Sequence, residues 1–139
     1  MRFKKAIAAV AMAGGILAGG LATAAPASAH ACPNAPGGIC LYYNSAANNH
    51  GASVEVEIND WSYHPYTFAC DSLTGNCNGA GQPAYNRAAS VKNYSMHTYV
   101  VYYNSGWDCS YACQTIARGT FPDLNPTMKN NNASGQWVL

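Results

Sequence analysis

Two closely spaced cysteines are the residues of this chain best placed to do chemistry. The stretch DCSYAC, Asp108 to Cys113, puts only Ser110, Tyr111 and Ala112 between Cys109 and Cys113. Close cysteine pairs ligate metals, exchange thiols and disulfides, or close a rigid loop. These uses imply different functions, so the rest of the chain must decide between them.

The N-terminal residues have the composition of an export signal. Arg2, Lys4 and Lys5 precede an apolar, alanine-rich run that reaches to about Thr23, and an A-x-A pattern follows at residues 27–29. We therefore expect a secretory signal peptide over residues 1–29 and one secreted, extracellular domain over residues 30–139. The run is too rich in Ala and Gly for a transmembrane anchor, so no membrane association is expected after signal removal.

The charge of the expected domain disfavours large anionic partners. Three of the seven basic residues lie in the signal, so four basic residues face six acidic ones and the net charge is minus two. A chain without a basic patch cannot neutralise many phosphates. We therefore expect neither nucleic acid nor membrane as a partner, and we expect a monomer.

All six cysteines lie in the expected domain. An even number in an exported chain favours three disulfides over metal ligation or free thiols. Six cysteines allow fifteen pairings, and the spacing suggests that neighbours pair. The expected pairs are Cys32 with Cys40, Cys70 with Cys77, and Cys109 with Cys113. A redox role would need C-x-x-C at a helix start, which DCSYAC does not provide.

Two short sequence motifs recur later in the domain in the same order, and we call each such repeat an echo. The two echoes indicate that the domain consists of two related halves. LYYNS at residues 41–45 returns as VYYNS at 101–105, and NRAAS at 86–90 returns as NNNAS at 130–134. We place the first half at about 32–93 and the second at about 99–139. The first half is longer, so we expect an insertion near residues 60–83, held by Cys70 and Cys77.

Period-two patterns predict strands throughout the domain. Ser53 to Ile58 is the clearest, because Val54, Val56 and Ile58 alternate with polar residues. Further β-branched or aromatic runs cover residues 39–43, 99–103 and 114–117. We therefore expect an all-β fold in which two Greek-key motifs form a disulfide-stapled sandwich, with Trp137 and several tyrosines in the core.

The order of motifs in this domain resembles the double Greek key of the βγ-crystallin superfamily. Each half has an aromatic Y-N-S turn, then an alternating strand, and then a late N-x-x-A-S segment. Within that superfamily, CPNAPGGICLYYNS and YYNSGWDCSYACQTIARG look most like the secreted actinobacterial metalloproteinase inhibitors, peptidase inhibitor family I-36. The resemblance spans nearly all of residues 32–134. It implies a protein that blocks thermolysin-like metalloendopeptidases by presenting a strained loop to the active-site cleft.

Carried over by position, the resemblance makes Cys109, Ser110, Tyr111, Ala112 and Cys113 the reactive loop. It also implies a reactive bond between Cys109 and Ser110, and it supports the pairing of the two N-terminal cysteines. The family's ring has one more residue, and a bulky apolar residue stands where this chain has Ser110. Three alternatives follow: Tyr111 takes that place, the target protease differs, or inhibition has been lost.

A binding module for calcium or cell-wall polysaccharide is the main alternative. Microbial βγ-crystallin domains bind calcium through paired Asn/Asp, two free positions, Ser/Thr and Ser. Here YNRAAS at 85–90 and KNNNAS at 129–134 lack the leading ligand and the penultimate hydroxyl. We therefore expect no metal, and we expect Ser90 and Ser134 to hold the folded turns by hydrogen bonds. The aromatic run DWSYHPYTF at 60–68 either stacks on sugar rings or packs in the core.

An enzyme is the other class considered. Glu57, Arg87 and His97 have the residue types of a small ribonuclease, but no hydrolase motif and no basic face accompany them. A mature N-terminal His30 could chelate copper, yet His50, His64 and His97 show no ligand spacing and suggest ordinary surface imidazoles. We therefore expect no catalytic residue and no cofactor. A purely structural role for the DCSYAC disulfide remains an open alternative.

Overall fold

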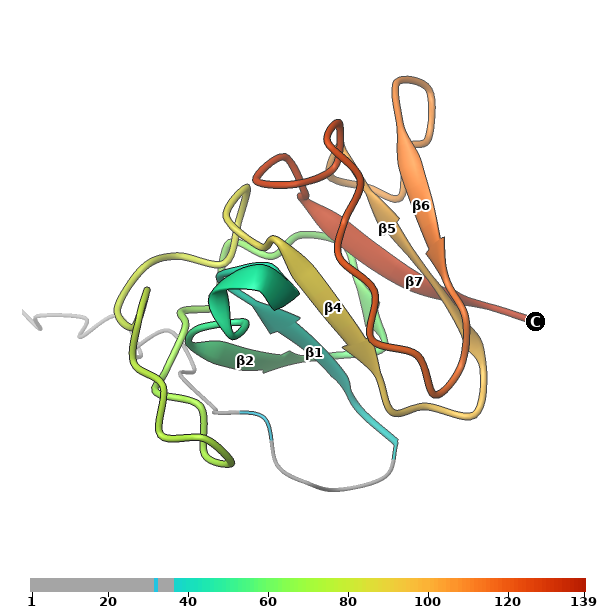
Figure 1. Ribbon diagram of the computed structural model, residues 1–139. Coiled ribbons are helices and arrows are strands. Elements are labelled where there is room, and N and C mark those ends of the chain that lie inside the picture. The colour runs from blue at the N-terminus through green and yellow to red at the C-terminus, as the bar shows by residue number, and fades with distance from the viewer. Residues whose placement is uncertain (1–31, 33–36) are drawn as a thin grey trace, which may run out of the picture.

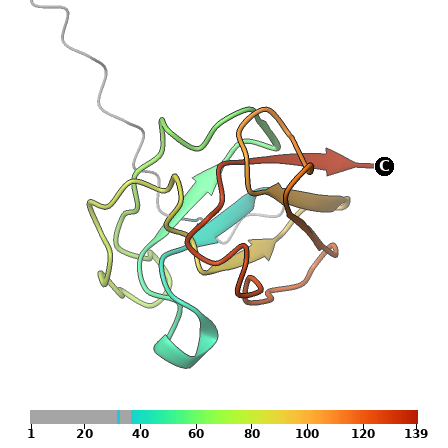
Figure 2. The same ribbon diagram turned by 90° about the horizontal axis from the view of Figure 1, so that it is seen from above.

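The computed structural model describes residue 32 and residues 37–139. In this part of the chain, seven strands form two antiparallel sheets, and one short helix lies outside them (Figure 1). The strands are β1 (Ile39–Tyr42), β2 (Ser53–Val56), β3 (Asn59–Asp60), β4 (Ser90–Asn93), β5 (Thr98–Tyr102), β6 (Cys113–Ile116) and β7 (Ser134–Val138). The 3-10 helix η1 (Ala46–Asn48) projects from the remainder of the chain in Figure 2. The expected signal peptide and His30 lie outside the described residues.

Each half of the chain contributes a segment to the other half's sheet. The sheets have the orders β2-β1-β4 and β3-β7-β5-β6, so β3 of the first half pairs with β7 of the second. In return, residues 120–124 run beside β4, where Val91 N donates to Pro122 O at 3.2 Å and Asn93 N donates to Thr120 O at 3.0 Å. The expected all-β fold of two Greek-key motifs is confirmed.

The core lies between the two sheets and is filled by apolar residues that alternate along the strands. Tyr63 and Tyr99 are fully buried at its centre, where their hydroxyls lie 2.9 Å apart. A Cβ at Gly135 would overlap both hydroxyls, so β7 needs glycine at this position. Trp137, which we expected in the core, is only partly buried and packs against its edge.

The strand expected over residues 53–58 is shorter than its apolar pattern. It ends at Val56, and Ile58 lies outside it. Ser53 was expected to face away from the core with the glutamates, yet it is fully buried. Its hydroxyl is buried because other segments cover it: Ser53 Oγ donates to Asp71 Oδ1 at 3.0 Å and accepts from Cys32 N at 3.3 Å.

The structure contains the three disulfides between sequence neighbours: Cys32 with Cys40, Cys70 with Cys77, and Cys109 with Cys113. Three disulfides indicate an oxidising, extracellular type of environment. Within the part of the chain described here, no helix has the length and apolar character needed to cross a membrane.

Candidate functional site

The ring of residues 109–113 follows β5 and leads directly into β6, and it forms the orange loop that projects above β6 in Figure 1. Cys113 is the first residue of β6 and pairs with Tyr102. The antiparallel ladder continues into the ring, because Tyr103 N donates to Ala112 O at 3.0 Å. Sheet hydrogen bonds therefore fix one side of the ring.

Asp108 holds the other side of the ring. Its Oδ1 accepts a hydrogen bond of 2.8 Å from Ser110 N, and its Oδ2 accepts one of 2.8 Å from Ser110 Oγ. Asn104 Nδ2 adds a third bond of 3.1 Å to Oδ2. These bonds, led by the one from the Ser110 amide, lower the pKa of Asp108. The carboxylate is therefore charged at neutral pH and fixes the backbone around Ser110.

Trp107 anchors the chain just before the ring. Its Nε1 donates to Asp60 O at 3.0 Å and to Gly135 O at 3.1 Å, and its backbone N donates to Ser134 Oγ at 3.2 Å. Trp107 has φ 59°, a left-handed conformation that costs about 1–3 kcal/mol for a non-glycine residue. The three hydrogen bonds hold this conformation, so the ring starts from a fixed point on β3 and β7.

The tip of the ring displays Tyr111. This side chain is 69% exposed, and its ring centroid lies 4.6 Å from that of Tyr103. Cys109 and Ser110 are also exposed, whereas Ala112 packs against the core. The arrangement is a short, disulfide-closed loop with a fixed base and one large exposed side chain.

The second segment of each echo lies beside its counterpart. Asn86 N donates to Asn132 O at 2.8 Å, and Asn130 N donates to Ala88 O at 2.9 Å. Asn86 and Asn130 both have positive φ, at 57° and 59°. Asn86 is equivalent to Asn130, and Ala88 to Asn132, so the two hydrogen bonds join equivalent pairs of residues in opposite directions. The two segments are therefore related by an approximate twofold axis.

Comparison with solved structures supports the type of fold. No protein-family model and no curated protein matches the sequence. A solved structure described as "Evolution of the eye lens beta-gamma-crystallin domain fold" superposes with a TM-score of 0.54 at 15% identity, over 78% of this chain and 92% of that one. The chain has a βγ-crystallin-like fold. The N-terminal domain of protein S has a TM-score of 0.46 at 18% identity, over 73% of this chain and 94% of that one.

In this βγ-crystallin-like fold, the final serines of the two echoes hold the Y-N-S turns. Ser90 Oγ donates to Asn44 O, and Ser134 Oγ donates to Asn104 O, each at 2.7 Å. Both serines are fully buried. Tyr85 and Lys129 occupy the leading positions of the two segments. Among the described residues, no group of three or more His, Cys, Asp or Glu could hold a metal ion.

The ribonuclease-like candidates do not share the pocket that Arg87 lines. Arg87 lines a pocket near the two echo segments, but neither Glu57 nor His97 is among the described residues that line it. Each described histidine instead packs on an aromatic ring. The centroid distances are 3.9 Å for His50 and Phe121, 3.7 Å for His64 and Tyr85, and 4.6 Å for His97 and Trp137.

The aromatic run at residues 60–68 divides between the core and the surface. Tyr63 and Phe68 are buried in the βγ-crystallin-like core. Trp61 is 63% exposed and meets Trp107 edge-on, with 5.2 Å between ring centroids. Core packing therefore accounts for Tyr63 and Phe68 but not for Trp61, whose side chain stays at the surface.

Sequence reasoning missed the residues that hold the ring in place. Asp108 and Ser110 form an Asx-type turn, and the D-x-S spacing is a local signal that could have revealed it. The contact of Trp107 with Asp60 spans 47 residues and depends on β3 crossing to the other sheet. No local pattern contains that information.

Proposed function

We propose that the protein is a secreted inhibitor of extracellular, thermolysin-like metalloendopeptidases that binds them through the 109–113 ring. The observation that supports this function best is the exposed Tyr111 on a disulfide-closed loop whose backbone is held by Asp108. The ring also stands at the position that the resemblance to metalloproteinase inhibitors assigns to the reactive loop.

A held loop binds more tightly than a mobile one because less entropy is lost on association. The ordering cost avoided is about 0.5–1.5 kcal/mol per immobilised side chain. Tyrosine is among the residues that contribute most at protein interfaces. If the protease cuts the ring, the disulfide keeps the two new ends together. Such a product leaves slowly and can re-form its bond, which favours inhibition over degradation.

Tyr111 is the side chain best suited to the apolar pocket of such a protease. The Ser110 hydroxyl already donates a hydrogen bond to Asp108, whereas the exposed Tyr111 side chain presents a large apolar surface. Of the three alternatives, we therefore favour the one in which Tyr111 takes the place of the family's bulky residue. The reactive bond is then the one between Ser110 and Tyr111.

The proposal is tested by measuring inhibition of a thermolysin-like enzyme with purified residues 30–139 and the variant Tyr111→Ala. We expect the inhibition constant to rise at least about tenfold, because an interface tyrosine is lost. The melting temperature should stay the same, because Tyr111 is exposed. Met96→Ala is the matched control, since Met96 is 72% exposed and precedes the opposite end of β5. Equal inhibition by wild type and Tyr111→Ala would contradict the role of Tyr111.

A second candidate is a module that binds cell-wall polysaccharide, and the exposed Trp61 favours it. An accessible indole face stacks on sugar rings, and Trp61 is held beside Trp107 and Gly106. Co-sedimentation with insoluble cell walls by the wild type, lost in Trp61→Ala, would support this candidate. Retention of inhibition in the same variant would separate the two functions.

A further inference from the structure

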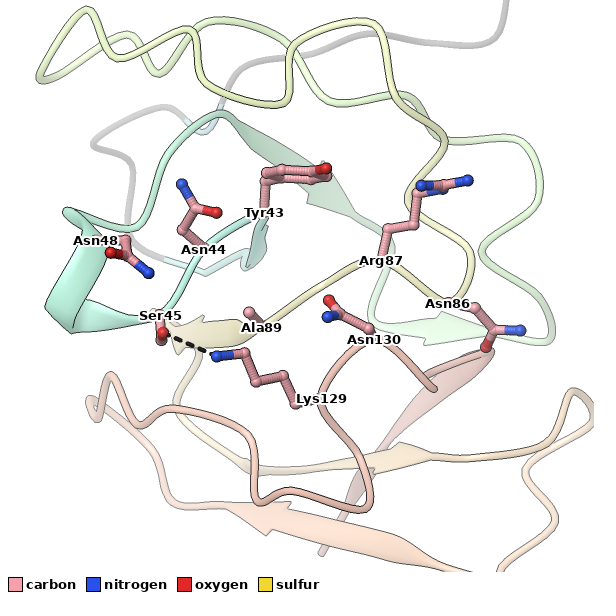
Figure 3. Close-up of a pocket in the computed structure, with 9 residues that line it drawn as sticks. All are labelled: Tyr43, Asn44, Ser45, Asn48, Asn86, Arg87, Ala89, Lys129 and Asn130. Carbon is pink, nitrogen blue, oxygen red and sulfur yellow. Dashed lines mark hydrogen bonds between the residues drawn. The ribbon is translucent and has the colours of Figure 1, made fainter.

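A polar pocket of about 280 Å³ lies where the two halves meet, away from the ring. The first Y-N-S turn and η1 contribute Asn44, Ser45 and Asn48 to its wall. The echo segments contribute Arg87, Lys129 and Asn130. We call this the Lys129 pocket. Figure 3 shows Arg87 and Asn48 at opposite ends of it, with Lys129 extending toward Ser45.

The charge of the Lys129 pocket is positive. Arg87 and Lys129 are two of only four basic residues in residues 30–139. None of the described residues that line the pocket is acidic. Both side chains add positive charge to the pocket wall, and no described lining side chain adds negative charge, so the local potential attracts anions. The pocket therefore favours an anionic ligand over a cation such as calcium.

The donors of the Lys129 pocket are suited to an oxyanion. Lys129 Nζ donates to Ser45 Oγ at 3.1 Å, which uses one of the three N–H donors of the ammonium. The Arg87 guanidinium has a planar set of donors that matches a carboxylate or phosphate. Asparagine amides around them can bond to neighbouring hydroxyl groups of a ligand.

The backbone that carries these donors is already in place. Asn86 precedes Arg87 and Asn130 follows Lys129 along the chain. The two backbone hydrogen bonds between the echo segments fix Asn86 and Asn130 in place. Ser90 Oγ, bonded to Asn44 O, fixes the turn that faces them. A ligand therefore does not have to order this backbone when it binds, which lowers the cost of association.

We propose that the Lys129 pocket binds the oxyanion of a small polar ligand, either a carboxylate or a phosphate. Its volume is slightly below the range of about 300–1,000 Å³ typical of pockets for drug-sized ligands. This size suits a ligand no larger than a single charged sugar. The inference does not rest on protease inhibition, because the pocket and the ring share no residues.

The experiment is an NMR titration of ¹⁵N-labelled residues 30–139 with sodium glucuronate and with inorganic phosphate. Glucose serves as the uncharged probe, and sodium chloride serves at matched ionic strength. We expect saturable shifts of the Asn48 and Asn130 signals, with a dissociation constant of about 1 mM or lower. Saturation by glucuronate alone indicates a sugar acid, by phosphate alone a phosphate group, and by both the bare oxyanion; each supports the proposal.

Variants make the assignment specific. Lys129→Gln should raise the dissociation constant at least about tenfold, because a charged hydrogen bond is lost. Lys129→Arg should restore binding, which separates the charge from the fold. Lys92→Gln is the matched control, since Lys92 Nζ lies over the Tyr94 ring at 4.5 Å and outside the pocket. No saturable shift with either anion, equal shifts with chloride, or unchanged binding in Lys129→Gln would overturn the proposal.

Discussion

Single buried hydroxyls hold the turns of the two halves, and their removal should be costly. Ser134 Oγ donates to Asn104 O and accepts from Trp107 N, and it is fully buried. We expect Ser134→Ala to lower the free energy of unfolding by about 1–3 kcal/mol, because buried polar groups lose their partner. Urea denaturation measures the change. Ser110→Ala is the exposed control and should change stability by no more than about 0.5 kcal/mol; equal losses in both variants would argue against the anchoring role.

His50 gives the fold a pH dependence whose sign follows from its surroundings. Burial against Phe121 and beside Ser90 lowers its pKa, and Asp123 partly opposes the shift. The unfolded chain therefore binds a proton more readily than the folded one. The stability that this histidine contributes is present above its unfolded pKa of about 6.5, and it is lost as the pH falls through the lower folded value.

The melting temperature should accordingly fall between about pH 7.5 and pH 5, and His50→Gln should flatten that fall. Calorimetric scans across this range test the expectation. His64→Gln is the comparison variant, because His64 is an exposed histidine stacked on Tyr85. A slope that is the same in wild type and His50→Gln would show that another group causes the dependence.

At the scale of elements, the ring should matter more for binding than for stability. A five-residue ring restricts the unfolded chain by only roughly 2 kcal/mol, and the β5–β6 ladder holds its base without it. We expect Cys109→Ser with Cys113→Ser to leave the domain folded, as judged by circular dichroism, and to raise the inhibition constant at least about tenfold. Cys70→Ser with Cys77→Ser is the matched control, and it should lose stability without losing inhibition. The opposite pattern would make the 109–113 disulfide a purely structural staple.

Elements with their own period-two pattern could be predicted, and elements defined by their partners could not. The strands expected at 39–43, 99–103 and 114–117 occur within one residue of their expected bounds. β3 has only two residues, and residues 120–124 join β4 through alternate backbone bonds. Neither segment has a local apolar repeat that would predict it. Each is held by hydrogen bonds to a strand of the other half.

At the scale of the whole molecule, the repeat predicted the architecture because equivalent residues make equivalent contacts. The hydrogen bonds from Ser90 to Asn44 and from Ser134 to Asn104 link the same positions of the two echoes. The net charge, by contrast, was a poor guide to the surface. The net charge of minus two for residues 30–139 does not reveal that Arg87 and Lys129 line one pocket, because residues 42 positions apart come to the same wall only after the halves pair.

The central claim is that the intact domain blocks a metalloendopeptidase, and titration of enzyme activity tests it most directly. A thermolysin-like enzyme would be incubated with increasing amounts of purified, oxidised residues 30–139, and its residual activity on a peptide substrate would be measured. Inhibition with a constant in the micromolar range or below corresponds to a binding free energy of about −8 kcal/mol or better. The account predicts a saturable loss of activity at such concentrations. Undiminished enzyme activity at micromolar protein would contradict it.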